Sequence, residues 1–332
     1  MNNFPLGDIG LPAPPWLFIG LLLLIFFLHL ISMWLLLGSL IVGLVEIAKT
    51  KVNWEQALSL RYLPIIMALV INLGVPPLLF LQVLYPPFFF SSSIIIAAPW
   101  FTVFLLVMAS YGFIYAARYG AKKKWQAILF LSISALTALW VSFTFSNNMS
   151  LMIKPAFWQE LYSYKQNGLN LYPNLPEVIS RWAWVLSPLF VAGATLLKRS
   201  KYWSIATAII GAVALLAYRS FLPPEVLNHS LVNIGTIVDF TLLGVLLVMV
   251  FVPLKNQEFS KPIFFSWLAL KGLTVVAIRH GIRAASLDPI YPLAKLPIEF
   301  QPYVLTIFLV ALVIGVIALG WMFVKGSKEL DI

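Results

Sequence analysis

Apolar windows long enough to cross a bilayer recur nine times along the chain. A helix rises 1.5 Å per residue, so about 20 apolar residues cross the ~30 Å hydrocarbon core. Lipid offers no hydrogen-bond partner to the backbone, so such segments must be helices that satisfy their own backbone groups. The sequence therefore predicts an all-α fold, a polytopic integral membrane helix bundle with about nine transmembrane helices. The windows cover residues 16–45, 62–85, 100–118, 125–145, 178–197, 202–222, 230–254, 262–280 and 303–324.

Composition supports this class. Of the 332 residues, 61% are apolar and 10% are charged, and the mean hydropathy is +0.94. A soluble domain could not solvate such a surface. The formal net charge of +10 would suggest nucleic acid as the partner of a soluble protein, but no basic arm is present, so membrane lipids are the expected surroundings and no nucleic acid is expected.

The distribution of Lys and Arg predicts how the chain is oriented. With the N-terminus outside and the C-terminus inside, the inner connections carry 14 basic residues and the outer connections and span ends carry seven. Such an excess is typical of the cytoplasmic side. No Lys or Arg precedes the first apolar run, so a cleaved signal peptide is not expected. We therefore predict one multi-pass domain, residues 1–332, in the cell inner (cytoplasmic) membrane.

Cysteine is absent from the sequence. This excludes iron–sulfur clusters held by thiolates and covalent c-type haem in this chain. Phosphate-binding glycine loops and zinc-protease signatures are also missing. We expect no enzymatic activity of the chain alone, which leaves open a component of a quinol/cytochrome c oxidoreductase.

The longest outer connection is predicted to contain a surface helix. Residues 146–177 include the stretch KPAFWQELYSYKQNG, in which Pro155 suits a helix start and Gly168 a stop. The helix either forms part of an interfacial aromatic belt or offers a docking surface to another subunit.

The stretch NLGVPPLLFLQVLYPP, residues 72–87, predicts a break inside the second window. Pro76 and Pro77 lack the N–H groups that carbonyls one turn earlier need. Those carbonyls must turn toward protein, water or ligand. We expect a kink that faces His29 and lines a cavity, with Asn72 near the midplane and Gln82 nearer the outer mouth; the alternative is a kink that only shapes packing.

Two charged residues fall near mid-membrane in consecutive spans. Asp239 lies about nine residues from the outer end of its window, and Lys271 about nine residues from the inner end of the next. Antiparallel spans bring both to the same depth, and either charge alone in lipid is costly. We predict a buried ion pair, either a structural lock or part of a proton or ion path.

His29 lies deep in the first window. A histidine there is either hydrogen-bonded to a neighbouring helix, a ligand to haem iron, or a donor to a quinone head group. The two alternatives with a ligand make haem b and quinone the candidate cofactors.

Basic side chains gather near the predicted outer surface. Arg279 and Arg283 are four residues apart in the stretch RHGIR, so a helix places them on one face. Together with Arg181, Arg219, His229 and His280 they form a cluster suited to clamp haem propionates, lipid head groups or carboxylates of a partner. Snorkelling to the interface, or pairing with local carboxylates, is the alternative.

Five motifs carry a resemblance to a known group of proteins. LHLISMWLLLGS, NLGVPPLLFLQVLYPP, FSNNMSLMIKP, ISRWAWVLSP and RHGIR resemble, in this order, an uncharacterised group of bacterial membrane proteins associated with or fused to c-type cytochromes. These are similar to small membrane b-type cytochromes. The resemblance implies His29 as a haem ligand and a c-type cytochrome as an outer-side partner. It also implies a second His in the fifth span, where this chain has Trp184.

Three functions fit the sequence. The first is a membrane subunit of a respiratory electron-transfer complex, which relays electrons between membrane quinone and a periplasmic c-type cytochrome or anchors that cytochrome. The second is a proton-coupled transporter or channel, against which the odd span count and the absence of repeats weigh. The third is a cofactor-free structural membrane anchor.

Overall fold

The computed structural model describes residues 10–49, 58–164, 166–196, 201–251 and 261–329. These residues are mostly helical, and an isolated bridge joins Leu11 to Ile298. The long helices are α1 (Pro15–Lys49), α2 (Leu58–Leu84), α4 (Ala97–Tyr115), α5 (Lys124–Met152), α7 (Leu175–Leu186), α8 (Leu189–Leu196), α9 (Lys201–Ser220), α11 (Ser230–Phe251), α12 (Lys261–Leu287) and α13 (Pro302–Glu329). Of the helices above, α8 is short and forms one span together with α7. The remaining helical elements are α3 (Pro86–Ile95), α6 (Trp158–Tyr164), α10 (Pro224–Leu227), a π-turn at Ala116–Gly120 and 3₁₀ turns at Pro155–Phe157 and Leu293–Lys295.

The predicted membrane helix bundle is confirmed. In the described part of the chain, eight helical segments are long and apolar enough to cross a membrane, with α7 and α8 together forming one of them. A shorter apolar stretch at 302–318 lies in α13. These nine segments match the nine predicted windows, and the chain is a multi-pass membrane protein.

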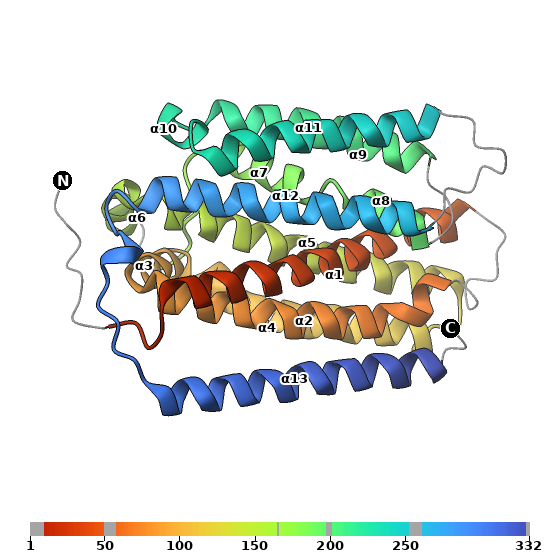
Figure 1. Ribbon diagram of the computed structural model, residues 1–332. Helices are drawn as coiled ribbons and strands as arrows, with labels where there is room; N and C mark the ends of the chain where they lie inside the picture. The colour runs from red at the N-terminus through yellow and green to blue at the C-terminus, as the bar shows by residue number, and fades with distance from the viewer. Residues whose placement is uncertain (1–9, 50–57, 165, 197–200, 252–260, 330–332) are drawn as a thin grey trace.

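The first span, α1, packs against four other helices, which are α2, α8, α5 and α12. Other close pairs are α4 with α5, α7 with α9, and α11 with both α9 and α12. Connections lie at the two ends of the bundle, and α13 runs along one side (Figure 1). The end that carries α3, α6 and α10 is the one predicted to face outward, and we call it the outer end.

Two glycines let α1 and α8 meet backbone to backbone. A Cβ on Gly38 of α1 would collide with the carbonyl oxygen of Leu189 and lie 2.6 Å from the amide nitrogen of Gly193 of α8. A Cβ on Gly193 would collide in turn with the Gly38 carbonyl. Small residues are what permit such close approach between membrane helices.

The fifth span is interrupted between α7 and α8. Pro188 has no N–H for the carbonyl of Trp184, and the hydroxyl of Ser187 donates to that carbonyl instead, at 2.9 Å. The indole of Trp34 donates to the carbonyl of Val185 at 2.7 Å. Side chains thus satisfy the carbonyls that the break releases, as a span inside a protein requires.

The second span differs from its prediction. α2 runs without interruption from Leu58 to Leu84, with Pro64, Pro76 and Pro77 inside it. The expected break at Pro76–Pro77 was therefore wrong, and the helix ends just before Tyr85 instead. Membrane helices tolerate internal proline where neighbouring groups accommodate it.

The outer segment 146–177 is more helical than predicted. α5 continues through it to Met152, and the 3₁₀ turn and α6 follow. Gly168 has φ of 72°, a left-handed conformation that suits glycine at a chain reversal. On α6 the side chain of Leu161 is buried.

Candidate functional site

A cavity of about 590 Å³ lies among six helices, α1, α2, α4, α5, α7 and α12. Its volume is in the range of small-molecule sites. Most of its lining is apolar. The lining residues of α2 recur every three to four positions, along one face of that helix. The polar and ionisable lining residues are His29, Ser110, Tyr111, Ser142, Ser146, Arg181, Trp182, Arg279, His280 and Arg283.

The cavity reaches the lipid-facing surface of the bundle. Val75 of α2 lines it and is 51% exposed, and Phe104 and Met108 of α4 line it and are 69% and 58% exposed. These side chains stand between the interior space and the surroundings of the bundle. This wall between α2 and α4 is therefore where an apolar chain from the membrane would enter.

His29 joins α1 to α2 at the wall of this cavity. Its Nδ1 lies 3.0 Å from the carbonyl oxygen of Val70. A carbonyl only accepts, so Nδ1 carries the proton and Nε2 keeps its lone pair. The ring packs against Gly74, where an added Cβ would lie 2.9 Å from its Cε1. Nε2 forms no hydrogen bond with any described residue, so this atom is available to a ligand.

Four of the six residues in the predicted basic cluster also line the cavity, whereas Arg219 and His229 do not. Arg181 donates from Nη1 to the carbonyl of Ser146 at 3.2 Å and to the hydroxyl of Ser150 at 3.0 Å. The Arg279 guanidinium lies 4.3 Å from the ring centroid of Phe26. The structure thus brings His29, Arg181, Arg279, His280 and Arg283 to one space.

Asn72 and Gln82 do not line this cavity. Asn72 is exposed, and its side chain donates to the carbonyl of Ala68 in the preceding turn at 2.8 Å. It lies two residues from both Val70 and Gly74, which on a helix is the opposite face. The expectation that Asn72 shares a site with His29 is therefore corrected, as is the placing of Gln82 at the cavity mouth.

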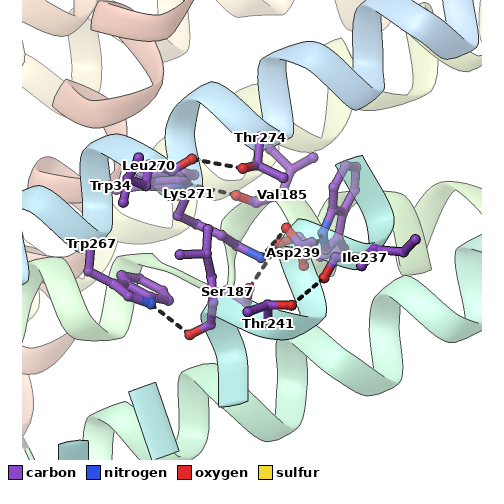
Figure 2. Close-up of polar contacts among 12 residues, drawn as sticks. Trp34, Val185, Ser187, Ile237, Asp239, Thr241, Trp267, Leu270, Lys271 and Thr274 are labelled. Carbon is purple, nitrogen blue, oxygen red and sulfur yellow. Dashed lines mark hydrogen bonds and ion pairs between the residues drawn. The ribbon is translucent and has the colours of Figure 1, made fainter. Parts of the chain in front are cut away.

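Asp239 and Lys271 form an ion pair away from this cavity. Nζ of Lys271 lies 2.5 Å from Oδ1 of Asp239, and both side chains are fully buried (Figure 2). The indole of Trp184 donates to Oδ2 of Asp239 at 3.4 Å. In Figure 2 the pair lies close to Ser187, where the fifth span is interrupted. Each carboxylate oxygen has a donor, as a buried charge requires.

Sequence reasoning missed several lining residues. Trp182 lines the cavity and donates to the hydroxyl of Ser142 at 2.9 Å, and Ser110, Tyr111 and Ser146 also line it. The signal available for Trp182 was its position beside Arg181. Trp184, which stands where the resemblance implies histidine, donates to Asp239.

Several residues at the wall of the cavity are of the kinds that hold a haem b. Histidine that binds a metal usually donates its other ring N–H to a carbonyl or carboxylate, as His29 does to Val70. Met33 and Met108 line the same cavity and carry thioether sulfur, a known second axial ligand. The arginines suit propionates. The residues present therefore fit one axial nitrogen ligand, with sulfur available in the same cavity.

Comparison with known proteins yields a fold match. The chain is similar to a chain in the structure of bd oxidase from Geobacillus thermodenitrificans, with a TM-score of 0.61 over 96% of this chain and 99% of that chain, at 13% identity. No family model and no curated protein matches the sequence. At this identity the likeness is one of fold. The matched structure is a bd oxidase, so the resemblance to proteins associated with c-type cytochromes stays a prediction.

Proposed function

We propose that the chain is a subunit of a respiratory electron-transfer complex in the inner membrane, and that its cavity binds a membrane quinone beside His29. The observation that carries this proposal is the cavity itself, which reaches the lipid-facing surface at Val75, Phe104 and Met108 and has His29 and arginines at its wall. A quinone needs an apolar slot, a lateral way in for its tail and a few hydrogen-bonding groups for its head.

The protonation of His29 suits both forms of such a ligand. Its unprotonated Nε2 accepts from a hydroquinone hydroxyl, whereas the guanidinium of Arg279 donates to a quinone carbonyl. The bond to Val70 fixes this tautomer and the orientation of the ring. The chain's own contribution is thus to position the head group, supply hydrogen-bond partners and exclude water.

The fold likeness to a chain of a bd oxidase structure supports a place in a respiratory assembly. Other subunits would carry the remaining redox centres. A c-type cytochrome at the outer end, near α3, α6 and α10, is the partner we propose. The chain would relay electrons between quinone and this cytochrome or anchor it.

Haem b is the second candidate ligand, because the His29 tautomer and the methionines in the cavity fit it. When bound there, it would supply one-electron transfer. Its reduced-minus-oxidised absorption bands in the purified protein test this candidate directly.

Organic extraction of the purified full-length protein tests the quinone proposal. We expect the wild type to retain quinone. The amount retained should fall about tenfold in His29→Leu, because one good hydrogen bond to the ligand is lost. His229→Leu is the matched control, because His229 does not line the cavity. A wild-type protein that neither retains quinone nor binds added decylubiquinone would refute the proposal.

A further inference from the structure

We propose that Arg181, Arg279 and Arg283 form an anion site, and that the ligand of the cavity carries an acidic head group on a long apolar chain. This inference rests on the proposed function and deepens it, since it fixes the charge of the head group. The basis is an excess of buried and partly buried positive charge in one part of a mostly apolar cavity.

The three guanidiniums have no carboxylate partner. Arg181 is 6% exposed and Arg283 is 9% exposed. Within the described ranges, no Asp or Glu oxygen lies within 4.0 Å of any of the three side chains. A buried charge without a counter-charge is costly, so the buried Arg181 and Arg283, with the partly buried Arg279 beside them, indicate a negatively charged ligand.

The nearest acidic side chain on the same helix is engaged elsewhere. Glu177 lies one turn before Arg181 on α7. Its carboxylate accepts from the hydroxyl of Tyr172 at 3.1 Å and lies 3.7 Å from Nζ of Lys154. That carboxylate forms no ion pair with Arg181, so it leaves the positive charge facing the cavity without a close partner.

The arginines also have N–H groups that are not used in hydrogen bonds. Nε of Arg279 is buried and has no hydrogen-bond partner among the residues described. Arg181 makes both of its hydrogen bonds from Nη1, and each arginine carries five N–H donors. All three also line a second space of about 10 Å³ beside Tyr218, room for about one water-sized group. Guanidinium pairs bind carboxylate, phosphate or other anionic oxygens in a bidentate manner.

The rest of the cavity lining indicates that the ligand has an apolar tail. Away from the arginines most of the lining side chains of α1, α2, α4 and α5 are apolar, with His29, three serines and Tyr111 among them, and the lining includes the exposed Val75, Phe104 and Met108. A free phosphate or small carboxylate would leave this part of the cavity unfilled. An acidic hydroxyquinone with an alkyl tail, or an anionic lipid, fills both parts.

Two matched pairs of probes test the inference on the full-length protein in detergent. The first pair is 2-hydroxy-3-undecyl-1,4-naphthoquinone, which is anionic at pH 7, and its neutral 2-methoxy ether. Their binding is followed by quenching of tryptophan fluorescence, since Trp100 and Trp182 line the cavity. The second pair is dioleoylphosphatidylglycerol and neutral dioleoylglycerol, each measured by its shift of the unfolding temperature and by competition with the naphthoquinones.

We expect the acid of each pair to bind about 10- to 100-fold more tightly than its neutral partner, the effect of a charge-assisted hydrogen bond. Arg279→Gln should remove most of this preference and Arg279→Lys should retain part of it. Arg219→Gln is the control, because Arg219 donates to Thr236 and does not line the cavity. The wild-type comparison needs no variant, so it decides the matter even if a variant fails to fold.

The outcomes separate this inference from the proposed function. Equal binding of acid and ether overturns the anion site and leaves the quinone proposal standing. Binding of phosphatidylglycerol without either naphthoquinone supports the anion site, and the quinone proposal is then overturned if decylubiquinone also fails to bind. Binding of no probe overturns the anion site, and failure of decylubiquinone to bind as well overturns both.

Discussion

The buried pair of Asp239 and Lys271 gives the sharpest prediction for a single residue. Replacing Lys271 with Met leaves the Asp239 charge without its cation, and breaking a buried pair in this way costs about 3–5 kcal/mol. We expect the unfolding temperature of the detergent-purified protein to fall strongly. The double variant Asp239→Asn with Lys271→Met leaves no uncompensated charge and should recover much of the loss. A Lys271→Met protein as stable as the wild type would show that the pair contributes nothing.

Gly74 controls the position of the His29 ring. A Val side chain there places its Cβ too close to Cε1 of His29, so the ring must shift and strain its bond to Val70. We expect Gly74→Val to fold but to bind decylubiquinone at least several-fold more weakly, measured by fluorescence titration. Gly112→Val on α4 is the control, since a Cβ at Gly112 meets no atom within 4 Å. An unchanged affinity of Gly74→Val for decylubiquinone would show that the position of the His29 ring does not affect ligand binding.

Single polar residues in the spans could be predicted from the sequence, but the space they share could not. His29 and Arg279 stood out because ionisable groups in membrane segments are rare. Asn72 stood out by the same rule and lies on another face of α2, because depth along a helix says nothing about its rotation. The cavity volume depends on how six helices pack, and no local pattern specifies that.

The seam between α1 and α8 is the feature to test at the scale of secondary-structure elements. Gly193→Leu inserts a side chain where the Gly38 carbonyl lies, so the two helices must separate. We expect a loss of folded, monodisperse protein in size-exclusion chromatography. Gly244→Leu on α11 is the matched control, because a Cβ there meets nothing within 4 Å. A monodisperse Gly193→Leu protein with wild-type stability would contradict the close contact.

Helix boundaries followed the hydropathy windows closely, but helix interruptions did not follow proline alone. α2 accommodates Pro76 and Pro77, whereas the fifth span is interrupted at Ser187–Pro188. Near Pro188 the released carbonyls accept hydrogen bonds from the side chains of Ser187, Trp34 and Thr207. Two of these donors come from distant helices, so the sequence near Pro188 could not predict the interruption.

At the scale of the whole molecule, the orientation remains a prediction from the charge distribution. A reporter fused after Ile332 tests it. We expect a C-terminal green fluorescent protein to fluoresce and a C-terminal alkaline phosphatase to be inactive, because the C-terminus is predicted inside. Fusions at Leu169, between α6 and α7, should show the opposite pattern. Phosphatase activity at the C-terminus would invert the outer and inner ends used here, and with them the side proposed for the cytochrome.

The interruption of the fifth span also has an electrical consequence. A helix carries about half a positive elementary charge at its N-terminus and half a negative one at its C-terminus. α7 ends and α8 begins inside the bundle, so partial charges of opposite sign meet near Ser187, next to the Asp239–Lys271 pair. The surroundings of that pair are therefore polarised in a fixed direction. The double variant Asp239→Lys with Lys271→Asp would keep the attraction between the two charges but reverse the direction of the pair relative to this local field. The variant and the wild type should therefore differ in stability.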